Sequence, residues 1–281
     1  MDHEARLERL LVGLRGLGLL REWPLGDGTD ADAQLRAIAE LLAHRDEPPM
    51  ADALDLREYD HAEGYAEWAA TYDDEGNALL AVEEPWLREL LADIPPGDAV
   101  DVACGTGRLS ERLCALGHRV TGVDPSEAML AKARAKGLAA SFVLGSFDDV
   151  PMPDASADLV TSALALTHVT DLKPAIREVA RVVRPGGHVL VSDVHPFAVA
   201  TGAQALFHGV DGSRAVTINY QHQVSDYVRA FLSAGLVIER CEEPLVDEGF
   251  KNGLGSEDVR AAADIGLTGM PLLLVWRLRR A

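Results

Sequence analysis

Leucine and isoleucine recur at helical spacing near the start of the chain. The positions are Leu7, Leu10, Leu11 and Leu14, and then Leu35, Ile38, Leu41 and Leu42. The break "PLGDGTD" separates the two sets, so the pattern predicts two short amphipathic helices. The segment 44–60, rich in proline and charge, is expected to be a linker. The two helices are expected to pack on the main domain as a cap, or else to form a dimer contact or an active-site lid.

From about residue 60 onward, strand-like and helix-like segments alternate. Apolar, β-branched runs predict strands at 98–104, 119–124, 140–145, 157–166 and 187–194. Between them, helical patterns lie at 84–94, 108–117, 126–137 and 172–183. This alternation favours a mostly parallel sheet with helices on both faces, which places the chain in the α/β class.

The last third of the sequence has a different pattern. Residues 196–224 lack clear periodicity, and a helix is expected at 225–235. Two apolar runs, 236–244 and 270–280, are separated by an irregular acidic stretch rather than by a clearly amphipathic crossover helix. We therefore expect these two runs to form an antiparallel pair at the end of the sheet.

The charge balance narrows the classes of partner. The 281 residues contain 26 Lys and Arg against 45 Asp and Glu, a formal net charge of -19. Such a surface repels nucleic-acid backbones and anionic lipid, so we expect neither as a partner. Three scattered cysteines predict neither a disulfide framework nor a metal site. No signal-like or membrane-spanning segment is evident, and a cytoplasmic location is expected.

The stretch "VDVACGTGRL", residues 100–109, predicts a strand, a glycine turn and the start of a helix. Gly105 and Gly107 lack side chains that would keep a ligand from the backbone, and a helix start offers unpaired N–H groups. A Walker-type phosphate loop is excluded because no Gly-Lys-Ser/Thr follows. Asp124, nineteen positions after Gly105, suits a ribose. Asp101, four positions before Gly105, suits an ammonium or sulfonium cation better than a pyrophosphate.

Four segments resemble, in order, the motifs of class I S-adenosylmethionine-dependent methyltransferases, in particular the branch that acts on small molecules and specialised metabolites. They are "VDVACGTGRLSERL", "VTGVDPSEAML", "FVLGSFDDVPMPDASADLVTSALALTHV" and "IREVARVVRPGGHVLVSD". The resemblance implies a Rossmann-like sheet of seven strands, the seventh antiparallel between the fifth and sixth. It implies a methyltransferase domain at 59–281, a substrate-side insertion at 196–260 and an N-terminal helical extension at 1–58.

The resemblance also implies cofactor contacts. Asp101 would serve the methionine ammonium, and Asp124 would accept both ribose hydroxyls. In many relatives the third motif carries an Asp that takes the adenine amino group, whereas Ser146 stands here, so recognition would lean on the backbone and ring of Phe147. The other implied contacts are Ala103, Cys104, Gly105, Thr106 and Gly107 under the methionine, Pro125 and Met129 near the adenine, Leu164 after the fourth motif strand, and Tyr65 and Tyr72 from an entry helix in "GYAEWAATYDD".

Methyl transfer needs a base only when the acceptor is protonated, and imidazole suits that task at neutral pH. His168, His195 and His222 follow or precede expected elements at the rim where such a sheet presents its site, and His195 and His222 are the stronger candidates by position. Each of the three could instead be a loop histidine bonded to backbone.

The acceptor is expected to be a small, hydrophobic or aromatic metabolite, because "PFAVATGAQALFHG" offers apolar surface with few charges. The Asp/Asn-Pro-Pro-aromatic signature of enzymes that methylate nucleic-acid amines is absent, and so are the spaced acids of magnesium-dependent relatives. The sequence leaves open whether oxygen, nitrogen or carbon is methylated, and whether the N-terminal helices form a homo-oligomer. Two alternatives remain: a protein that binds S-adenosylmethionine as a structural cofactor, sensor or cyclase-type catalyst without methylating, and a nicotinamide-dependent oxidoreductase.

Overall fold

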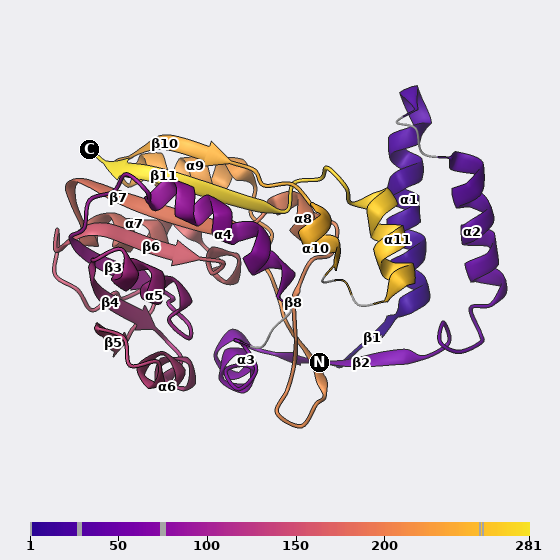
Figure 1. The fold of residues 1–281 in the computed structure, drawn as a ribbon, viewed down its shortest axis with the longest axis horizontal. Helices are drawn as coiled ribbons and strands as arrows, with labels where there is room; N and C mark the ends of the chain where they lie inside the picture. Colours follow the sequence, from indigo (N-terminus) through magenta and orange to yellow (C-terminus); the bar gives the residue numbers. More distant parts are fainter. Residues whose placement is uncertain (1, 27–29, 74–76, 253, 255) are drawn as a thin grey trace.

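The computed structural model describes residues 2–26, 30–73, 77–252, 254 and 256–281. Its centre is a seven-stranded sheet in the order β10-β11-β7-β6-β3-β4-β5 (Figure 1). The strands are β3 (Asp98–Val102), β4 (Arg119–Asp124), β5 (Ala140–Leu144), β6 (Ala157–Ala163), β7 (Val183–Val194), β10 (Leu236–Glu242) and β11 (Leu273–Arg280). Strands β5, β4, β3, β6 and β7 are parallel, and β11 runs antiparallel to both β7 and β10. The predicted α/β class and the antiparallel insertion of the last strand are confirmed.

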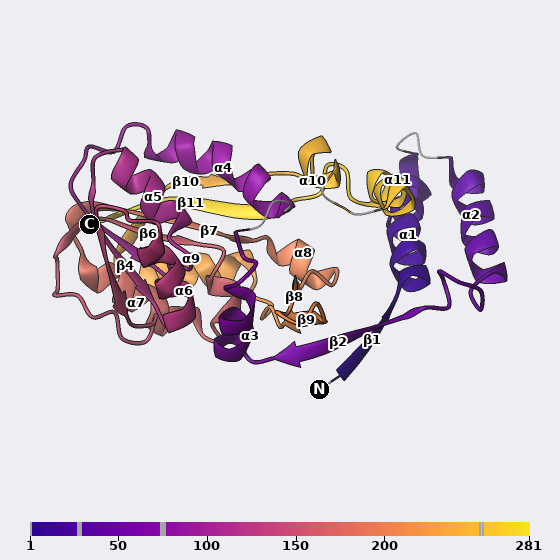
Figure 2. The same ribbon diagram turned by 60° about the horizontal axis from the view of Figure 1, so that its bottom comes forward.

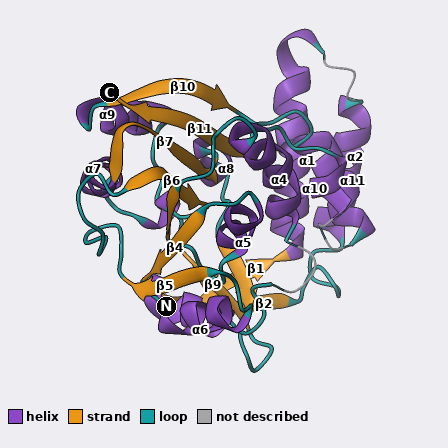
Figure 3. Cartoon of the chain, turned by 60° about the vertical axis from the view of Figure 1, so that its left-hand side comes forward, coloured by secondary structure: helices purple, strands orange, loops and turns teal. Residues whose placement is uncertain are grey.

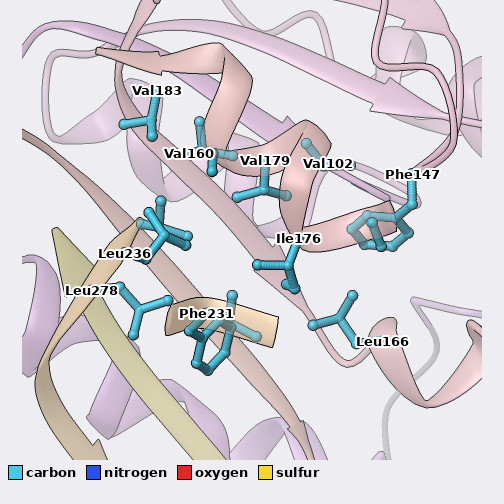
Figure 4. Packing of buried hydrophobic residues seen from close by; sticks show 14 of the residues in the cluster. Val102, Phe147, Val160, Leu166, Ile176, Val179, Val183, Phe231, Leu236 and Leu278 are labelled. Atoms are coloured by element: carbon cyan, nitrogen blue, oxygen red, sulfur yellow. The ribbon is translucent and has the colours of Figure 1, made fainter. Parts of the chain in front are cut away.

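Helices cover both faces of this sheet (Figure 3). They are α4 (Ala78–Leu91), α5 (Arg108–Ala115), α6 (Glu127–Ala135), α7 (Leu172–Val182) and α9 (Val224–Ser233). The main apolar cluster joins the central strands to α7 and α9, with Ile176, Phe231 and Leu278 among its buried members (Figure 4). A second cluster joins the opposite face to α4 and α5. Strands buried on both faces explain why the sequence shows near-continuous apolar runs there.

A second sheet, in the order β1-β2-β9-β8, lies beside the first. It consists of β1 (Asp2–Arg6), β2 (Ala53–Tyr59), β8 (Ala205–His208) and β9 (Arg214–Thr217). The prediction that 44–60 is only a linker is therefore wrong over 53–59. Strand β2 pairs antiparallel with β1 and parallel with β9, whose partner residues lie far away in the sequence. A charged, half-exposed strand whose pairing is this distant leaves little local signal.

The two expected N-terminal helices are α1 (Leu7–Leu25) and α2 (Ala31–Ala43). Together with α11 (Glu257–Gly266) they form a helical group at one end of the molecule (Figure 2). Leu11 and Leu14 of α1 pack on Ala262 and Ala263 of α11. A Cβ at Gly266 would lie 2.2 Å from the Leu14 carbonyl oxygen, so only glycine permits this close crossing.

The 3₁₀ turn η1 (Leu166–His168) and the short helices α8 (Pro196–Ala200) and α10 (Glu248–Asn252) were not predicted. Helix α3 (His61–Trp68) overlaps the entry helix that the resemblance implied in "GYAEWAATYDD". Helices α10 and α11 lie in the acidic stretch between the last two strands, where the sequence showed no clear helical pattern. Helix α3 begins at the Asp60 cap, whose carboxylate accepts the Glu63 N–H at 2.9 Å, and leads directly from the second sheet to the carboxyl edge of the first.

Candidate active site

The glycine turn between β3 and α5 lies at the carboxyl edge of the central sheet. Ala103, Gly105 and Gly107 have φ of 57°, 55° and 81°, which folds the chain sharply over the strand ends. A Cβ added at Gly105 would meet no described atom within 4 Å, whereas at Gly107 it would approach the Ala133 side chain at 3.1 Å. Gly107 thus permits close packing of the turn on α6, and no side chain at Gly105 keeps a ligand from the backbone.

Asp101, next to last in β3, lies beneath this turn and is 1% exposed. Its carboxylate accepts hydrogen bonds from Ser110 Oγ at 2.7 Å and Thr161 Oγ1 at 2.8 Å. Burial raises the pKa of Asp101 to about 6, and these two bonds offset only part of that effect. A buried carboxylate of this kind is stabilised by a cationic ligand.

Asp124 ends β4, the neighbouring strand. Its carboxylate accepts the backbone N–H groups of Gly105 and Ser126, each at 2.8 Å. Burial raises its pKa, and the two backbone bonds counteract that rise. Each carboxylate oxygen keeps a second lone pair, so the group can still accept two hydroxyls.

At the end of β5, Ser146 is half-buried and its Oγ accepts the Asp148 N–H at 3.2 Å. The Phe147 ring is 8% exposed and packs in the main core cluster (Figure 4). The expectation that this ring contributes to adenine recognition is therefore not supported, and only the Phe147 backbone remains for that role. Pro125 is exposed at the start of α6, while Met129 is buried one turn later.

Helix α3 and the residues after it cover the turn. Thr106 Oγ1 donates to Asp73 at 2.6 Å, and the same carboxylate lies 3.0 Å from Lys136 Nζ of the α6 terminus. Burial raises the pKa of Tyr72 to about 12, and the positive charge of Arg108 offsets part of that rise. Both expected tyrosines therefore lie on the segment that passes over the glycine turn.

Tyr65 joins α3 to η1, because its hydroxyl lies 2.6 Å from His168 Nε2. Burial raises the Tyr65 pKa well above its ordinary value, whereas burial and the nearby His61 lower the His168 pKa to about 4. Both shifts keep these groups neutral, so the contact is a hydrogen bond between a neutral phenol and a neutral imidazole. Through this hydrogen bond, His168 links η1 to α3.

The other two candidate histidines have different surroundings. His195 Nδ1 accepts the Phe197 N–H at 3.0 Å, and its Nε2 lies 3.0 Å from Glu243 Oε1. Both ring nitrogens of His195 thus have protein partners in this structure. His222 Nε2 lies 2.7 Å from the Val169 carbonyl oxygen, so Nε2 carries the proton and Nδ1 keeps its lone pair.

Leu164 follows β6 with φ of 54°, and its N–H donates to the Ser192 carbonyl at 2.8 Å. This conformation is strained for a branched side chain, and it turns the chain toward η1. Leu164 is half-buried at the same edge as Asp101. The strand ends therefore bring together residues that are spread over 60 positions in the sequence.

Sequence reasoning missed two buried acids at this edge. Glu83 of α4 is fully buried and bonds to Arg108 and Ser192. Asp193 of β7 accepts the Tyr227 hydroxyl at 2.7 Å, and burial raises its pKa to about 7. An acid inside a buried strand, as in "VSDV", was a usable signal for Asp193. Glu83 lies beside other charged residues in the sequence, so nothing in the local pattern indicated that it is buried. Within the described ranges, no three His, Cys, Asp or Glu side chains gather as a metal site.

Comparison with known proteins shows similarity to methyltransferases. A family model described as a methyltransferase domain matches residues 100–191. The malonyl-[acyl-carrier protein] O-methyltransferase of Hahella chejuensis is 32% identical over 225 residues, 74% of this chain and 77% of that protein. Its counterpart from Yersinia pestis is 33% identical over 174 residues, which span 60% of this chain and 65%, just under two thirds, of that relative's length.

Among solved structures, an S-adenosylmethionine-dependent methyltransferase from Mesorhizobium loti superposes with a TM-score of 0.57 at 26% identity, covering 73% of this chain and all of that one. In the described part of this chain, no helix is both long and apolar enough to cross a membrane. The open space at Gly105 and the buried carboxylates Asp101 and Asp124 fit the cofactor of these proteins. The chain belongs to the class I S-adenosylmethionine-dependent methyltransferase superfamily.

Proposed function

We propose that this protein transfers the methyl group of S-adenosylmethionine to a small, largely apolar or aromatic acceptor and releases S-adenosylhomocysteine. The observation that carries the proposal is the placement of Asp101, Gly105 and Asp124 at adjoining strand ends. Both carboxylates are buried, and a Cβ added at Gly105, in the turn between β3 and α5, would meet no described atom within 4 Å. A carboxylate suited to a cation on β3 and one suited to a diol on the neighbouring β4 match the amino-acid and ribose parts of this cofactor.

When bound, the cofactor supplies a sulfonium-activated methyl group, so the protein's task is alignment and the exclusion of water. Asp101 would hold the methionine ammonium and Asp124 the ribose hydroxyls. The turn Ala103–Gly107 would support the methionine part, with Leu164 at its side. Tyr65 of α3 and Tyr72, which follows that helix, would cover it, and Pro125 and Met129 would border the adenine.

The acceptor side is proposed to lie between α3, η1 and the segment 196–220. Aromatic rings dominate the contacts there: Trp68 stacks on Phe207 at 5.0 Å between centroids, and Tyr65 meets His168 edge-on at 5.2 Å. Val194, Ala198 and Val199 form a small apolar cluster nearby. Such walls favour an acceptor with an apolar or aromatic body.

A protonated acceptor, such as a phenol, requires a base, and His222 is the proposed one. Its Nε2–H is fixed on the Val169 carbonyl, which leaves Nδ1 as the proton-accepting nitrogen. His222 also packs edge-on against Tyr227, with 5.9 Å between ring centroids, so its ring plane is held by α9. Residues 1–58, with α1 and α2, are proposed to be an extension that shapes this acceptor side through β2.

The test is mass spectrometry of small molecules released from the purified protein, together with calorimetric titration with S-adenosylmethionine, S-adenosylhomocysteine and NAD. We expect copurified S-adenosylhomocysteine, or micromolar binding of the sulfonium cofactor, and no heat with NAD. A panel of phenols, amines and carboxylic acids, including an acyl-carrier-protein thioester of malonate, then reports the acceptor by product formation. Binding of NAD alone would refute the proposal.

A further inference from the structure

The three adjoining strand ends order the parts of a nucleoside ligand. Asp101 lies on β3, Asp124 ends β4, and Gly145 and Ser146 follow β5. The Gly145 N–H donates to the Asp124 backbone carbonyl at 3.2 Å, so the end of β5 lies directly beside the carboxylate assigned to the ribose. This inference rests on the proposed function: with the amino acid over β3 and the ribose at β4, the purine lies at β5.

Ser146 is the polar side chain that follows β5 at this point. Its Oγ accepts one hydrogen bond, from the Asp148 N–H. A hydroxyl keeps a second lone pair and a proton that can rotate, so it can accept from an amino group or donate to another group. A carboxylate at this position could only accept, and its hydrogen bonds are stronger because it is charged.

The acidic residues next to Ser146 do not supply the negative charge that the serine lacks. Asp148 and Asp149 are both exposed, and the backbone of Asp149 exchanges two hydrogen bonds of 3.3 Å with the backbone of Ser146. An exposed carboxylate is well hydrated, so a hydrogen bond from it to a ligand replaces a bond to water and adds little. The Phe147 ring, committed to the core, adds no contact with the exocyclic group either.

We propose that Ser146 makes the purine site insensitive to the group at position 6, so that the protein binds cofactor analogues lacking the 6-amino group nearly as tightly as the adenine forms. The purine ring nitrogens and the ribose then carry base recognition through backbone groups and Asp124. The class of ligand that this site takes is thereby wider than adenine nucleosides.

Calorimetry tests this with S-adenosylhomocysteine and its 6-deamino analogue, in which purine replaces adenine. For the unaltered protein we expect the two dissociation constants to differ by less than about fivefold, because a half-exposed hydrogen bond between neutral groups contributes no more than that to affinity. Ser146→Asp is expected to bind S-adenosylhomocysteine about tenfold more tightly and to discriminate against the analogue by about 10- to 100-fold. Ser141→Asp, an exposed position near the start of β5, is the matched control and is expected to leave the ratio unchanged.

The outcomes separate this inference from the proposed function. If the unaltered protein binds neither ligand, the proposed function fails. If it binds S-adenosylhomocysteine but loses more than about 20-fold with the 6-deamino analogue, the inference is overturned while the function stands. If Asp148→Asn then bound the two ligands equally well, the contact with the 6-amino group would be assigned to Asp148. Because the central comparison uses the unaltered protein, it stands even if Ser146→Asp does not fold.

Discussion

Lowering the pH from 7 to 5 should weaken the binding of S-adenosylhomocysteine through Asp101. Burial raises the pKa of this carboxyl to about 6, and only the ionised form attracts the ligand's ammonium. Affinity is therefore retained above that pKa and lost as the pH falls through it. The ionised fraction of Asp101 is about 0.9 at pH 7 and about 0.09 at pH 5. This predicts a dissociation constant about tenfold larger at pH 5, which is a loss of about 1.4 kcal/mol of binding free energy. The ammonium and carboxylate of the ligand keep their charges over this range.

The assay is calorimetry at the two pH values with S-adenosylhomocysteine and with 5′-methylthioadenosine, which lacks the amino-acid end. Both ligands keep the ribose, so any contribution from the raised pKa of Asp124 cancels in their ratio. Asp101→Asn is expected to bind S-adenosylhomocysteine about 10- to 100-fold more weakly at pH 7 and to lose the pH dependence of the ratio. The reasoning is refuted if the ratio of the two affinities in the unaltered protein is the same at pH 5 and pH 7.

Three further predictions follow from single contacts. Gly105→Ala and Gly186→Ala both place a Cβ in open space at positive φ, so each should lower the free energy of unfolding by about 1 kcal/mol. Only Gly105→Ala should abolish the binding of S-adenosylhomocysteine in calorimetry. Equal binding by the two variants would contradict the proposed cofactor site. Arg108→Met leaves the buried Glu83 carboxylate without its cation and should cost about 3 kcal/mol in urea unfolding, and an unchanged midpoint would show that the pair is dispensable. Tyr65→Phe removes a 2.6 Å hydrogen bond and should cost about 1 kcal/mol by the same assay, whereas a gain in stability would argue against the bond.

The central sheet could be predicted because its signals are local. Strand β4 was predicted with its observed bounds, since an apolar run is framed by glycine and by an acid at its end. Strand β11 was recognisable as a strand, and the family resemblance implied its antiparallel place. The glycine turn, Asp101 and Asp124 follow the same rule, because each lies within a few residues of a strand end.

The rest depends on pairing across the chain, which sequence patterning does not report. Strands β8 and β9 have four residues each, and β2 pairs with β1 at the start of the chain and with β9 beyond position 213. The roles of the histidines depend on what each ring nitrogen meets: Tyr65, Glu243 and the Val169 carbonyl are all distant in sequence from their partners. The burial of the Phe147 ring likewise depends on its packing against residues that are distant in sequence, such as Leu166 and Ile176 in the same apolar cluster.

The close crossing of α1 and α11 has a consequence for the synthesis of this protein. The apolar face of α1, with Leu11 and Leu14, is covered by a helix that leaves the ribosome about 250 residues later. At a translation rate of roughly 5–20 residues per second, that face stays uncovered for on the order of ten to fifty seconds before α11 is synthesised. Nascent chains should therefore present a leucine-rich helix to ribosome-associated chaperones throughout the synthesis of the methyltransferase domain, and slowing translation should lengthen that exposure.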